Sequence, residues 1–223
     1  MAAVALPLFF TANAIRVLLT ETYVRAAYPH LAPDDVLTEK RRTELAVLGL
    51  RAVDPLRGDS VASLRAPRLP SGRRAFTAKE LRHMRDVRAW LWRLLVFELV
   101  VVAVLAVAAV RARRELARAL LAGGVATIAI GVLALGVMLV DFDDVLLGFH
   151  KLLFEGQSWH FSNEDTLIRV YPERFWNWTG IAMGVLVVAR PAARRLATYR
   201  SRSSAVAAAS GRPRNACNAR RSR

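Results

Sequence analysis

The chain has 223 residues, 54% of which are hydrophobic, and it carries a formal net charge of +15. Its apolar residues are gathered into runs and do not recur at helix or strand spacing, which excludes an ordinary soluble domain. Four runs, at residues 1–19, 90–110, 119–141 and 176–190, approach the length of about 20 residues that a helix needs to cross a bilayer. The sequence therefore predicts an all-α membrane protein that folds as a four-helix transmembrane bundle.

The two central spans are the strongest, and the run at residues 119–140 contains no charged residue. The first span is short and contains Asn13 and Arg16. Its apolar stretch ends in the residues ANA (12–14), as in a cleaved signal peptide, although the basic segment that begins such peptides is absent. A truncated first helix is the other interpretation, because a start codon placed downstream of the true one would produce it.

Arginine sets the expected orientation of the spans. The connection at residues 111–118 contains four arginines and one acid, and the chain from Arg190 onward contains ten arginines and no acid. Short basic segments stay in the cytoplasm, so we expect this connection, the tail at 191–223 and both termini to be cytoplasmic. The segments at residues 20–89 and 142–175 are then extracytoplasmic, and the second of these holds six acids against three bases.

Tryptophan supports this arrangement, since it is enriched at both interfaces of a membrane. Trp90 and Trp92 stand at the outer end of the second span, and Trp176 and Trp178 at the outer end of the fourth. Much of the positive charge is then explained by its role in orienting the spans and by its attraction to anionic lipid headgroups. The Arg/Ala/Ser-rich tail predicts disorder and lacks the interleaved aromatic residues of a nucleic-acid-binding face. We expect membrane lipids, and no nucleic acid, among the partners.

Other kinds of site are excluded by what the sequence lacks. It contains neither a G-x-x-x-x-G-K nor a G-x-G-x-x-G phosphate loop, so no nucleotide cofactor is expected. Its single cysteine, Cys217, allows neither an internal disulfide nor a cysteine metal site. We therefore expect no cofactor and no metal.

Histidine provides the candidates for catalysis, because an imidazole can take and return a proton near neutral pH. The chain has four histidines, and each lies in one of the two expected outer segments: His30, His83, His150 and His160. This distribution places any proton-transfer site on the outer side of the membrane.

The residues FTAKELRHMRDVRAW, at positions 76–90, predict a helix that leads into the second span. Thr77 and Glu80 have the spacing of a capping box at its start. Glu80, His83 and Asp86 then share roughly one face, where a carboxylate could fix the tautomer of the imidazole. The alternative is a charged, solvated helix start whose histidine only caps or packs.

The residues DDVLLGFHKLLF, at positions 143–154, predict an amphipathic helix that dips into the membrane interface. His150 lies within this helix. The alternative is that His150 is a packing residue, as a histidine in an apolar stretch often is.

Three further arrangements stay open on the sequence alone. Ser158, within GQSWH, resembles the nucleophile of a G-x-S-x-G elbow, but no strand is predicted before it. The histidines could instead bind zinc with Asp86, although no local H-E-x-x-H pair is present. Glu98 lies midway along the second span and could pair with Arg93 or with Arg16.

The chain resembles a family of bacterial four-helix integral membrane proteins, the lipoprotein intramolecular transacylases. The resemblance rests on ELRHMRDV before the second span, FHKLLFEGQSWHF and TLIRVYPERFW after the third, and LPLFFTANAIRVLL in the first. It covers about Leu6–Arg190, with the long first outer segment least alike. The first helix is shorter than the family's, and the basic tail has no counterpart in it.

The resemblance implies an activity and a place for it. These enzymes act on diacylglyceryl-modified lipoproteins at the outer face of the bacterial cytoplasmic membrane. They move one acyl chain from the glycerol to the α-amine of the lipidated N-terminal cysteine, which leaves a lyso-form lipoprotein. The family's two catalytic histidines correspond to His83 and His150, whereas His160 does not occupy a histidine position of the motif.

The residues are suited to this chemistry. Converting an ester into an amide needs no ATP, and an N-terminal amine, with a pKa near 8, can give its proton to a neutral imidazole. A second imidazole could protonate the departing glycerol oxygen, and an acyl-imidazole intermediate is also open. We expect Asp86, Glu80, Trp159 and Asp165 to support the two histidines.

Two other functions remain on the sequence alone. One is a non-enzymatic scaffold or sensor whose outer segments bind a lipid or a partner protein. The other is a membrane acyl hydrolase, which would release free fatty acid. The sequence also leaves open which histidine acts as the base.

Overall fold

The computed structural model describes residues 2–154, 156 and 159–187. Over these residues the chain consists of helices joined by turns and loops, so the all-α prediction is confirmed. An isolated antiparallel bridge joins Arg68 and Arg74. The helices in chain order are α1 (Ala2–Leu18), α2 (Glu21–Ala27), η1 (Tyr28–His30), α3 (Glu39–Val53), η2 (Val61–Arg65), α4 (Ala78–Arg111), α5 (Arg113–Val140), α6 (Phe142–Leu153), α7 (Thr166–Val170) and a last helix over residues 173–187.

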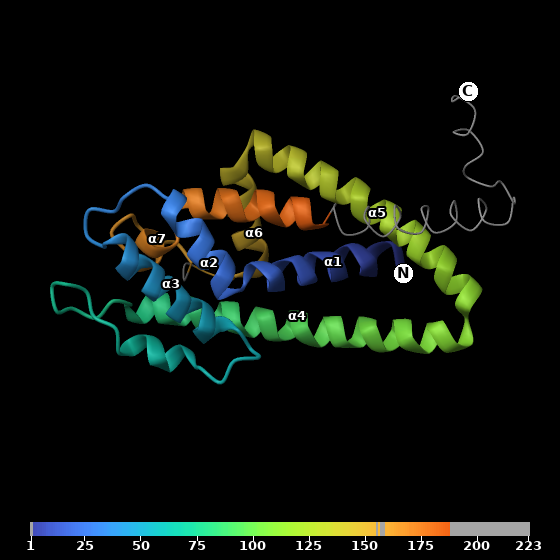
Figure 1. Ribbon diagram of the computed structural model, residues 1–223, viewed down its shortest axis with the longest axis horizontal. Coiled ribbons are helices and arrows are strands. Elements are labelled where there is room, and N and C mark those ends of the chain that lie inside the picture. The colour runs from blue at the N-terminus through green and yellow to red at the C-terminus, as the bar shows by residue number, and fades with distance from the viewer. Residues whose placement is uncertain (1, 155, 157–158, 188–223) are drawn as a thin grey trace, which may run out of the picture.

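The two longest helices, α4 and α5, meet at one end of the molecule and diverge from there (Figure 1). Ala112 alone separates Arg111, the last residue of α4, from Arg113, the first of α5. The connection expected at residues 111–118 is therefore much shorter than predicted, because α5 begins inside the arginine-rich stretch.

Helices α4 and α5 turn most of their apolar side chains outward. Only 17% and 22% of their most apolar stretches are buried, whereas the core helix of a soluble protein would be mostly covered. Both are long and apolar enough to cross a membrane. An exposed apolar surface of this extent is stable in hydrocarbon and not in water, so the chain is a membrane protein.

The other two predicted spans correspond to shorter segments. Helix α1 is apolar but has 17 residues. The helix that begins at residue 173 is described up to residue 187, so the end of the predicted span 176–190 lies outside the described residues, as does the tail at 191–223.

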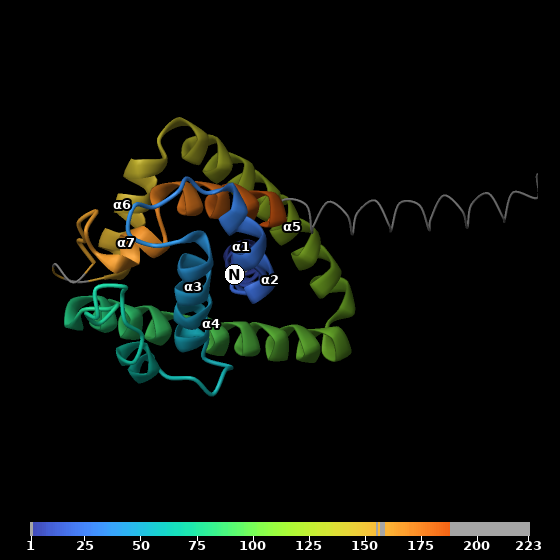
Figure 2. The ribbon, with the colours of Figure 1, turned by 60° about the vertical axis from the view of Figure 1, so that its left-hand side comes forward.

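Small residues let the apolar helices approach one another closely, as in other membrane proteins. Helix α1 lies between α4 and α5 in both ribbon views (Figures 1 and 2). The buried residues of α5 are small and recur every three or four positions: Gly123, Gly124, Thr127 and Gly131. The last helix packs on α5 through Gly180 and Gly184, where an added Cβ would press on Met138 and Leu135.

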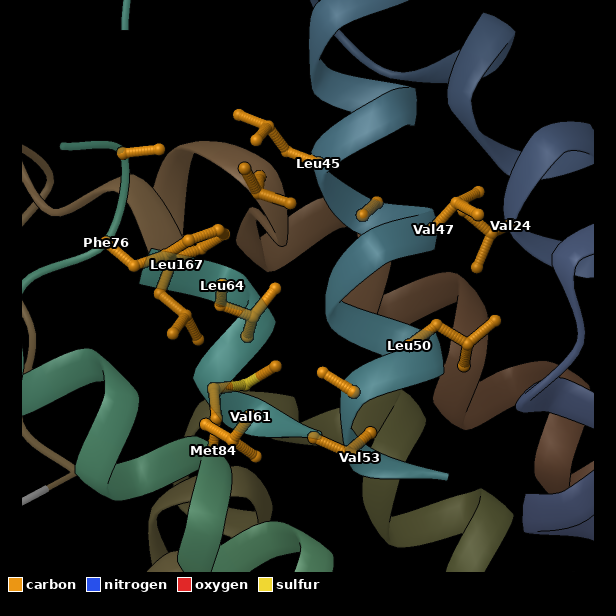
Figure 3. Packing of buried hydrophobic residues seen from close by; sticks show 14 of the residues in the cluster. Val24, Leu45, Val47, Leu50, Val53, Val61, Leu64, Phe76, Met84 and Leu167 are labelled. Atoms are coloured by element: carbon orange, nitrogen blue, oxygen red, sulfur yellow. The ribbon is translucent and has the colours of Figure 1, made fainter. Parts of the chain in front are cut away.

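A compact domain is built over the start of α4, and we term it the outer domain after the two predicted outer segments that form it. Its core combines side chains from α2, η1, α3, η2, α4 and α7, of which ten are labelled in Figure 3: Val24, Leu45, Val47, Leu50, Val53, Val61, Leu64, Phe76, Met84 and Leu167. The two predicted outer segments, which residues 90–141 separate in the sequence, therefore share one hydrophobic core.

Hydrogen bonds from buried tyrosines fasten the second outer segment to the first. The Tyr28 hydroxyl donates to the carbonyl of Val170, and the Tyr171 hydroxyl donates to the carbonyl of Ala46 at 2.7 Å. Burial raises the pKa of both phenols, so both stay protonated donors. Arg169 adds an ion pair with Asp35 at 2.6 Å.

The carboxylate of Glu80 is the central polar group of this domain. The predicted capping box is present: the Thr77 hydroxyl accepts from the Glu80 N–H at 3.3 Å, and Glu80 Oε2 accepts from the Thr77 N–H at 2.6 Å. The second oxygen of Glu80 accepts the N–H of Leu167 in α7, also at 2.6 Å. Glu80 is fully buried, so it joins the two outer segments where water cannot replace it.

We expect Glu80→Ala to destabilise the protein, because it leaves the N–H groups of Thr77 and Leu167 without an acceptor. An unsatisfied buried donor costs about 1–3 kcal/mol, so the combined loss for two donors should be about 2–6 kcal/mol. Thermal unfolding in detergent measures it. Arg82→Ala, an exposed change two residues along α4, is the control and should shift stability by less than about 0.5 kcal/mol. Equal effects of the two substitutions would contradict this role of Glu80.

Candidate active site

His83 lies in the second turn of α4, ahead of the apolar part of that helix. It is 6% exposed and follows the capping box of Thr77 and Glu80, which defines where α4 starts. Because the helix start is held by Glu80, the imidazole one turn later is held in place as well. The predicted helix over positions 76–90 is confirmed, and it continues without interruption into the apolar stretch.

His150 lies in the last turn of α6, the amphipathic helix predicted at positions 143–154. Asp141 caps this helix by accepting a hydrogen bond from the Asp144 N–H at 3.1 Å. The far end of α6 is held by Trp90, whose indole N–H donates to the carbonyl of Leu153 at 2.7 Å. Trp90 is two turns beyond His83 on the same face of α4, so this bond seats α6 against the face that carries His83.

The two histidines, which the resemblance names as the catalytic pair without placing them in space, lie close together in the structure. Their ring centres are 6.1 Å apart and their planes are inclined by 22°. Besides Phe149, which directly precedes His150 and whose ring lies 5.7 Å from it, three aromatic rings surround the two histidines. Phe154 lies 4.8 Å from His83 and 5.7 Å from His150, Phe161 lies 5.3 Å from His83, and Trp159 lies 5.3 Å from His150. These five residues form what we term the histidine–aromatic cluster.

The hydrogen bond of His150 assigns its tautomer. Its Nδ1 lies 2.8 Å from the carbonyl oxygen of Leu146, one turn earlier in α6. A carbonyl oxygen can only accept, so Nδ1 carries the proton in the neutral ring. The other nitrogen, Nε2, is then unprotonated and has a lone pair available to act as a base.

His83 is in a different state. Burial and, to a smaller extent, the nearby His150 together lower its pKa to about 4. The imidazole is therefore neutral at physiological pH. Its Nδ1 is buried and has no hydrogen-bond partner among the described residues. A buried polar atom left in this state is free to bind a substrate group.

The three acidic residues predicted to support the histidines differ in what their carboxylates contact. Both oxygens of Glu80 are occupied by backbone N–H groups, so its carboxylate does not pair with the His83 ring. Asp86 is half-buried one turn after His83, and no hydrogen bond or ion pair joins it to the described residues. Asp165 accepts from the backbone N–H of Ser162 at 2.8 Å and precedes α7 as its N-cap residue.

The aromatic residue predicted as a support, Trp159, does contact the site through its ring against His150. His160 stacks on the far side of Trp159 with ring centres 3.7 Å apart, and its carbonyl accepts a hydrogen bond from Lys79. His30 ends η1 and is exposed. Ser158 lies outside the described residues. Within the described part of the chain, no three His, Cys, Asp or Glu side chains gather closely enough to hold a metal ion.

Glu98 pairs with Arg16 of α1, at 3.2 Å, rather than with Arg93. Arg93 instead lies over the ring of Trp90, 4.8 Å from its centre. The sequence left both partners open, and the choice follows from the position of α1 between α4 and α5. This ion pair fastens α1 to α4 and takes no part in the histidine–aromatic cluster.

Phe154, Phe161 and the hydrogen-bonding role of Trp90 were missed by the sequence analysis. The spacing contains part of the signal: Phe154 follows His150 by four residues, one helical turn, and Trp90 follows His83 by seven. Phe161 has no such periodic relation to either histidine. The position of Phe161 depends on the loop after α6. Lys79, in the first turn of α4, lies over the Phe161 ring, 5.0 Å from its centre.

The fold is similar to that of solved membrane proteins. The in meso structure of the membrane integral lipoprotein intramolecular transacylase Lit from Bacillus cereus matches with a TM-score of 0.72 at 18% identity, covering 92% of this chain and 94% of that one. A structure of the same protein with one histidine replaced by alanine matches with a TM-score of 0.64 at 18% identity, covering 92% of each chain.

Sequence comparison gives two further findings. An uncharacterised protein of Aquifex aeolicus is 28% identical over 164 residues, which covers 72% of this chain and 74% of that protein. The family model described as "Lipoprotein intramolecular transacylase Lit" matches residues 4–176, which include α1, the outer domain, both long helices and the histidine–aromatic cluster. The chain therefore belongs to the lipoprotein intramolecular transacylase family, a family of membrane-bound acyltransferase enzymes.

Proposed function

We propose that this chain moves an acyl chain within a diacylglyceryl-modified lipoprotein, from the glycerol to the α-amine of the N-terminal cysteine, to give the lyso-form lipoprotein. The observation that carries the proposal is the pairing of His83 with His150 inside the histidine–aromatic cluster, with ring centres 6.1 Å apart. A catalytic group acts over about 3 Å, so two rings at this separation can act on the same ester group. Family membership supplies the substrate class.

His150 is the base in this proposal. Its Nδ1–H is engaged by the Leu146 carbonyl, which leaves the lone pair of Nε2 for the proton of the attacking amine. The amine nitrogen forms a bond to the ester carbonyl carbon, and its proton passes to Nε2. The same proton then returns to the glycerol oxygen as the carbon–oxygen bond breaks. One amide and one hydroxyl replace one ester and one amine, so no co-reactant is consumed.

His83 is the hydrogen-bond donor in this proposal. A neutral imidazole with a free Nδ1 can donate an N–H to the carbonyl oxygen, which gains negative charge as the amine attacks. The surrounding aromatic rings exclude water, and a hydrogen bond to a developing anion is stronger in such surroundings than in water. The low pKa of His83 keeps it from becoming a second cation beside His150.

The supporting residues act through position. Trp159 packs on His150, and the half-buried carboxylate of Asp86, one turn after His83 on α4, is proposed to attract the substrate amine as it binds. Glu80 and Asp165 act through the backbone, because their oxygens hold the starts of α4 and α7 and the turn at Ser162. Lipoprotein substrates and membrane lipids are the proposed partners, and no cofactor takes part.

The proposed topology follows from charge and from the two long helices. Four spans place both termini in the cytoplasm and the outer domain on the extracytoplasmic side of the bacterial cytoplasmic membrane. The histidine–aromatic cluster then lies at the outer leaflet, because it sits where α4 leaves the outer domain and where the amphipathic α6 ends. This is the leaflet in which a lipoprotein substrate would present its diacylglyceryl group.

We expect His83→Ala and His150→Ala each to reduce the rate of transacylation by about 10²–10⁴-fold, the usual contribution of a positioned acid or base. Mass spectrometry of a lipoprotein's N-terminal peptide measures the product, which has an N-acylated cysteine and one acyl chain left on the glycerol. His30→Ala, an exposed histidine outside the cluster, is the matched control and should retain full activity.

Other products would point to other functions. Release of free fatty acid with an unmodified amine would identify an acyl hydrolase. A lipoprotein that is unchanged whether or not the wild-type protein is present would leave a scaffold or sensor, and would overturn the proposal.

The state of His83 predicts how stability depends on pH. The pKa of this group is about 4 in the folded protein and close to 6.5 when unfolded, so its contribution to stability is complete above pH 6.5 and is lost as pH falls toward 4. Between these values we expect the wild type to lose up to about 3 kcal/mol relative to His83→Phe, which keeps an aromatic ring without a titrating group.

Thermal unfolding of both proteins from about pH 7.5 down to about pH 4.5 measures this difference, because this interval includes most of the range between the two pKa values. His30→Phe is the control, because an exposed histidine should show no such divergence from the wild type. Parallel curves for wild type and His83→Phe would mean that His83 is not buried in its neutral form.

The hydrogen bond of Trp90 should matter to the rate of the reaction. Trp90→Phe keeps an aromatic ring but removes the donor to the Leu153 carbonyl, which loosens the end of α6 beside His150. We expect kcat to fall about tenfold with a smaller change in KM, since a misplaced catalytic group weakens transition-state binding most. Trp92→Phe is the control, because Trp92 is 54% exposed and should be replaceable without loss.

A further inference from the structure

A second concave site lies in the outer domain, on a different face of α4 from the histidine–aromatic cluster. It is a hollow of about 420 Å³ whose lining includes Arg65, Arg73, Arg74 and Arg85. Phe76 and Leu81 contribute apolar surface to it. Leu81 and Arg85 are one turn apart on α4, and His83 between them points to the other side of the helix. We refer to this site as the arginine hollow.

The lining comes from three separate parts of the chain that are held against one another. Arg65 ends η2, Arg85 belongs to α4, and Arg73 and Arg74 lie on a turn between these helices. This turn is fastened by hydrogen bonds from the Leu69 N–H to the Arg73 carbonyl at 2.9 Å and from the Arg68 guanidinium to the Gly72 carbonyl at 2.8 Å.

Gly72 has a φ of +82°, which a residue with a side chain rarely adopts, so the turn depends on glycine at this position. This turn therefore brings Arg73 and Arg74 to the hollow that Arg65 and Arg85 also line.

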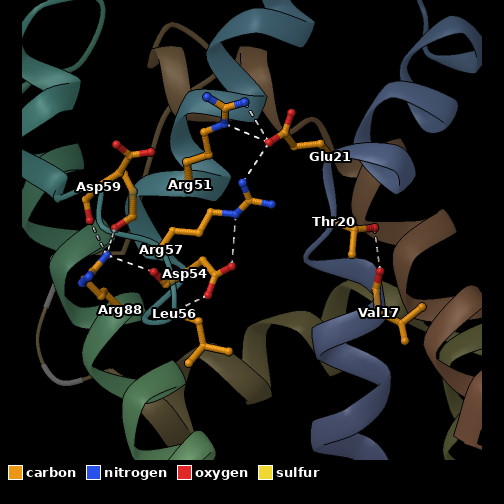
Figure 4. Close-up of polar contacts among 10 residues, drawn as sticks. Val17, Thr20, Glu21, Arg51, Asp54, Leu56, Arg57, Asp59 and Arg88 are labelled. Carbon is orange, nitrogen blue, oxygen red and sulfur yellow. Dashed lines mark hydrogen bonds and ion pairs between the residues drawn. The ribbon is translucent and has the colours of Figure 1, made fainter.

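The four arginines are unpaired, in contrast to their neighbours. No hydrogen bond or ion pair joins the side chains of Arg65, Arg73, Arg74 or Arg85 to the described residues, and no acid lines the hollow. Arg51, Arg57 and Arg88, in the same domain, each have partners, as Figure 4 shows. Arg51 and Arg57 bind Glu21 at 2.9 and 3.1 Å, and Arg88 binds the carbonyls of Ala52, Asp54 and Asp59.

Four like charges around one hollow repel one another unless an anion lies between them. The planar guanidinium group has donors in a fork that matches the oxygens of a phosphate, and several such groups around one anion are typical of phosphate sites. Phe76 and Leu81 are almost fully buried, so the side chains that a ligand in the hollow can reach are mainly the arginines. The height of the hollow relative to the membrane interface favours a phosphate carried by a lipid over a free inorganic ion.

We propose that the arginine hollow binds the phosphate of an anionic lipid headgroup, at a site separate from the one where acyl transfer takes place. Arg85 lies five residues, or about 7.5 Å along the helix axis, before Trp90. The headgroup layer extends about 5–8 Å beyond the hydrocarbon core, so the lower edge of the hollow is level with it. The bound lipid would fix the height of the outer domain above the bilayer.

Lipid retention by the full-length protein in detergent tests the proposal without requiring turnover. Native mass spectrometry would count the phosphatidylglycerol or phosphatidylcholine molecules retained by the wild type, by Arg73→Gln/Arg74→Gln and by Lys40→Gln/Arg82→Gln. The last pair is the matched control, since it removes two exposed positive charges from the same outer segment but not from the hollow. Equal thermal midpoints would establish that the variants are folded.

We expect retention of phosphatidylglycerol to fall about tenfold in Arg73→Gln/Arg74→Gln and to be unchanged in the control, with phosphatidylcholine unaffected in both. Loss of phosphatidylglycerol from wild type as salt is raised would support the same conclusion even if the double variant failed to fold. Equal retention by the two double variants, or retention by wild type that does not depend on salt, would overturn the proposal.

A competition arm distinguishes the source of the phosphate. Displacement of phosphatidylglycerol by millimolar inorganic phosphate, about the range of a weak free-ion site, would assign the hollow to soluble phosphate groups. Retention in its presence would assign the hollow to the lipid. The assay reads binding, so it is independent of whether His83 and His150 perform acyl transfer.

Discussion

The two hydrogen bonds that the Glu80 carboxylate accepts, one from Thr77 and one from Leu167, hold together the part of the molecule on which its chemistry depends. The first sets where α4 begins. The second brings α7, from the other outer segment, against that helix start. His83 follows Glu80 by less than one turn, and Phe161 precedes Leu167 by six residues. A single buried carboxylate therefore controls the approach of both to the site.

The site combines opposite physical requirements. Acyl transfer needs proton acceptors and donors, whereas the rings of Phe154, Phe161 and Trp159 exclude the water that would solvate them. The two imidazoles are prepared for these roles in different ways. Burial keeps His83 neutral, and a backbone carbonyl fixes which ring nitrogen of His150 carries the hydrogen. Neither histidine relies on a carboxylate, unlike the hydrolase arrangement that the acids near His83 suggested.

Local features of the sequence predicted local structure well. The capping box located the start of α4 because both of its partners lie within three residues, and the apolar spacing located α6 for a similar reason. The choice of His83 and His150 came from family resemblance, and their close approach came from the structure, since no periodicity joins residues 67 positions apart. Glu80 was expected beside His83 because its second partner, Leu167, lies 87 positions away and belongs to tertiary structure. Trp90 was expected as an interface residue, and its bond to Leu153 depended equally on a distant helix.

Helix α6 exposes Leu147, Phe149 and Leu152 while its last turn holds His150 against α4. These exposed side chains suit contact with acyl chains, and in the proposed reaction the lipid substrate would reach the site by diffusion in the plane of the bilayer. For such a substrate the meaningful concentration is its mole fraction among the surrounding lipids or detergent molecules. Adding more detergent at a constant amount of substrate would lower the mole fraction of substrate among the detergent molecules. Turnover would then slow with no change in the enzyme itself.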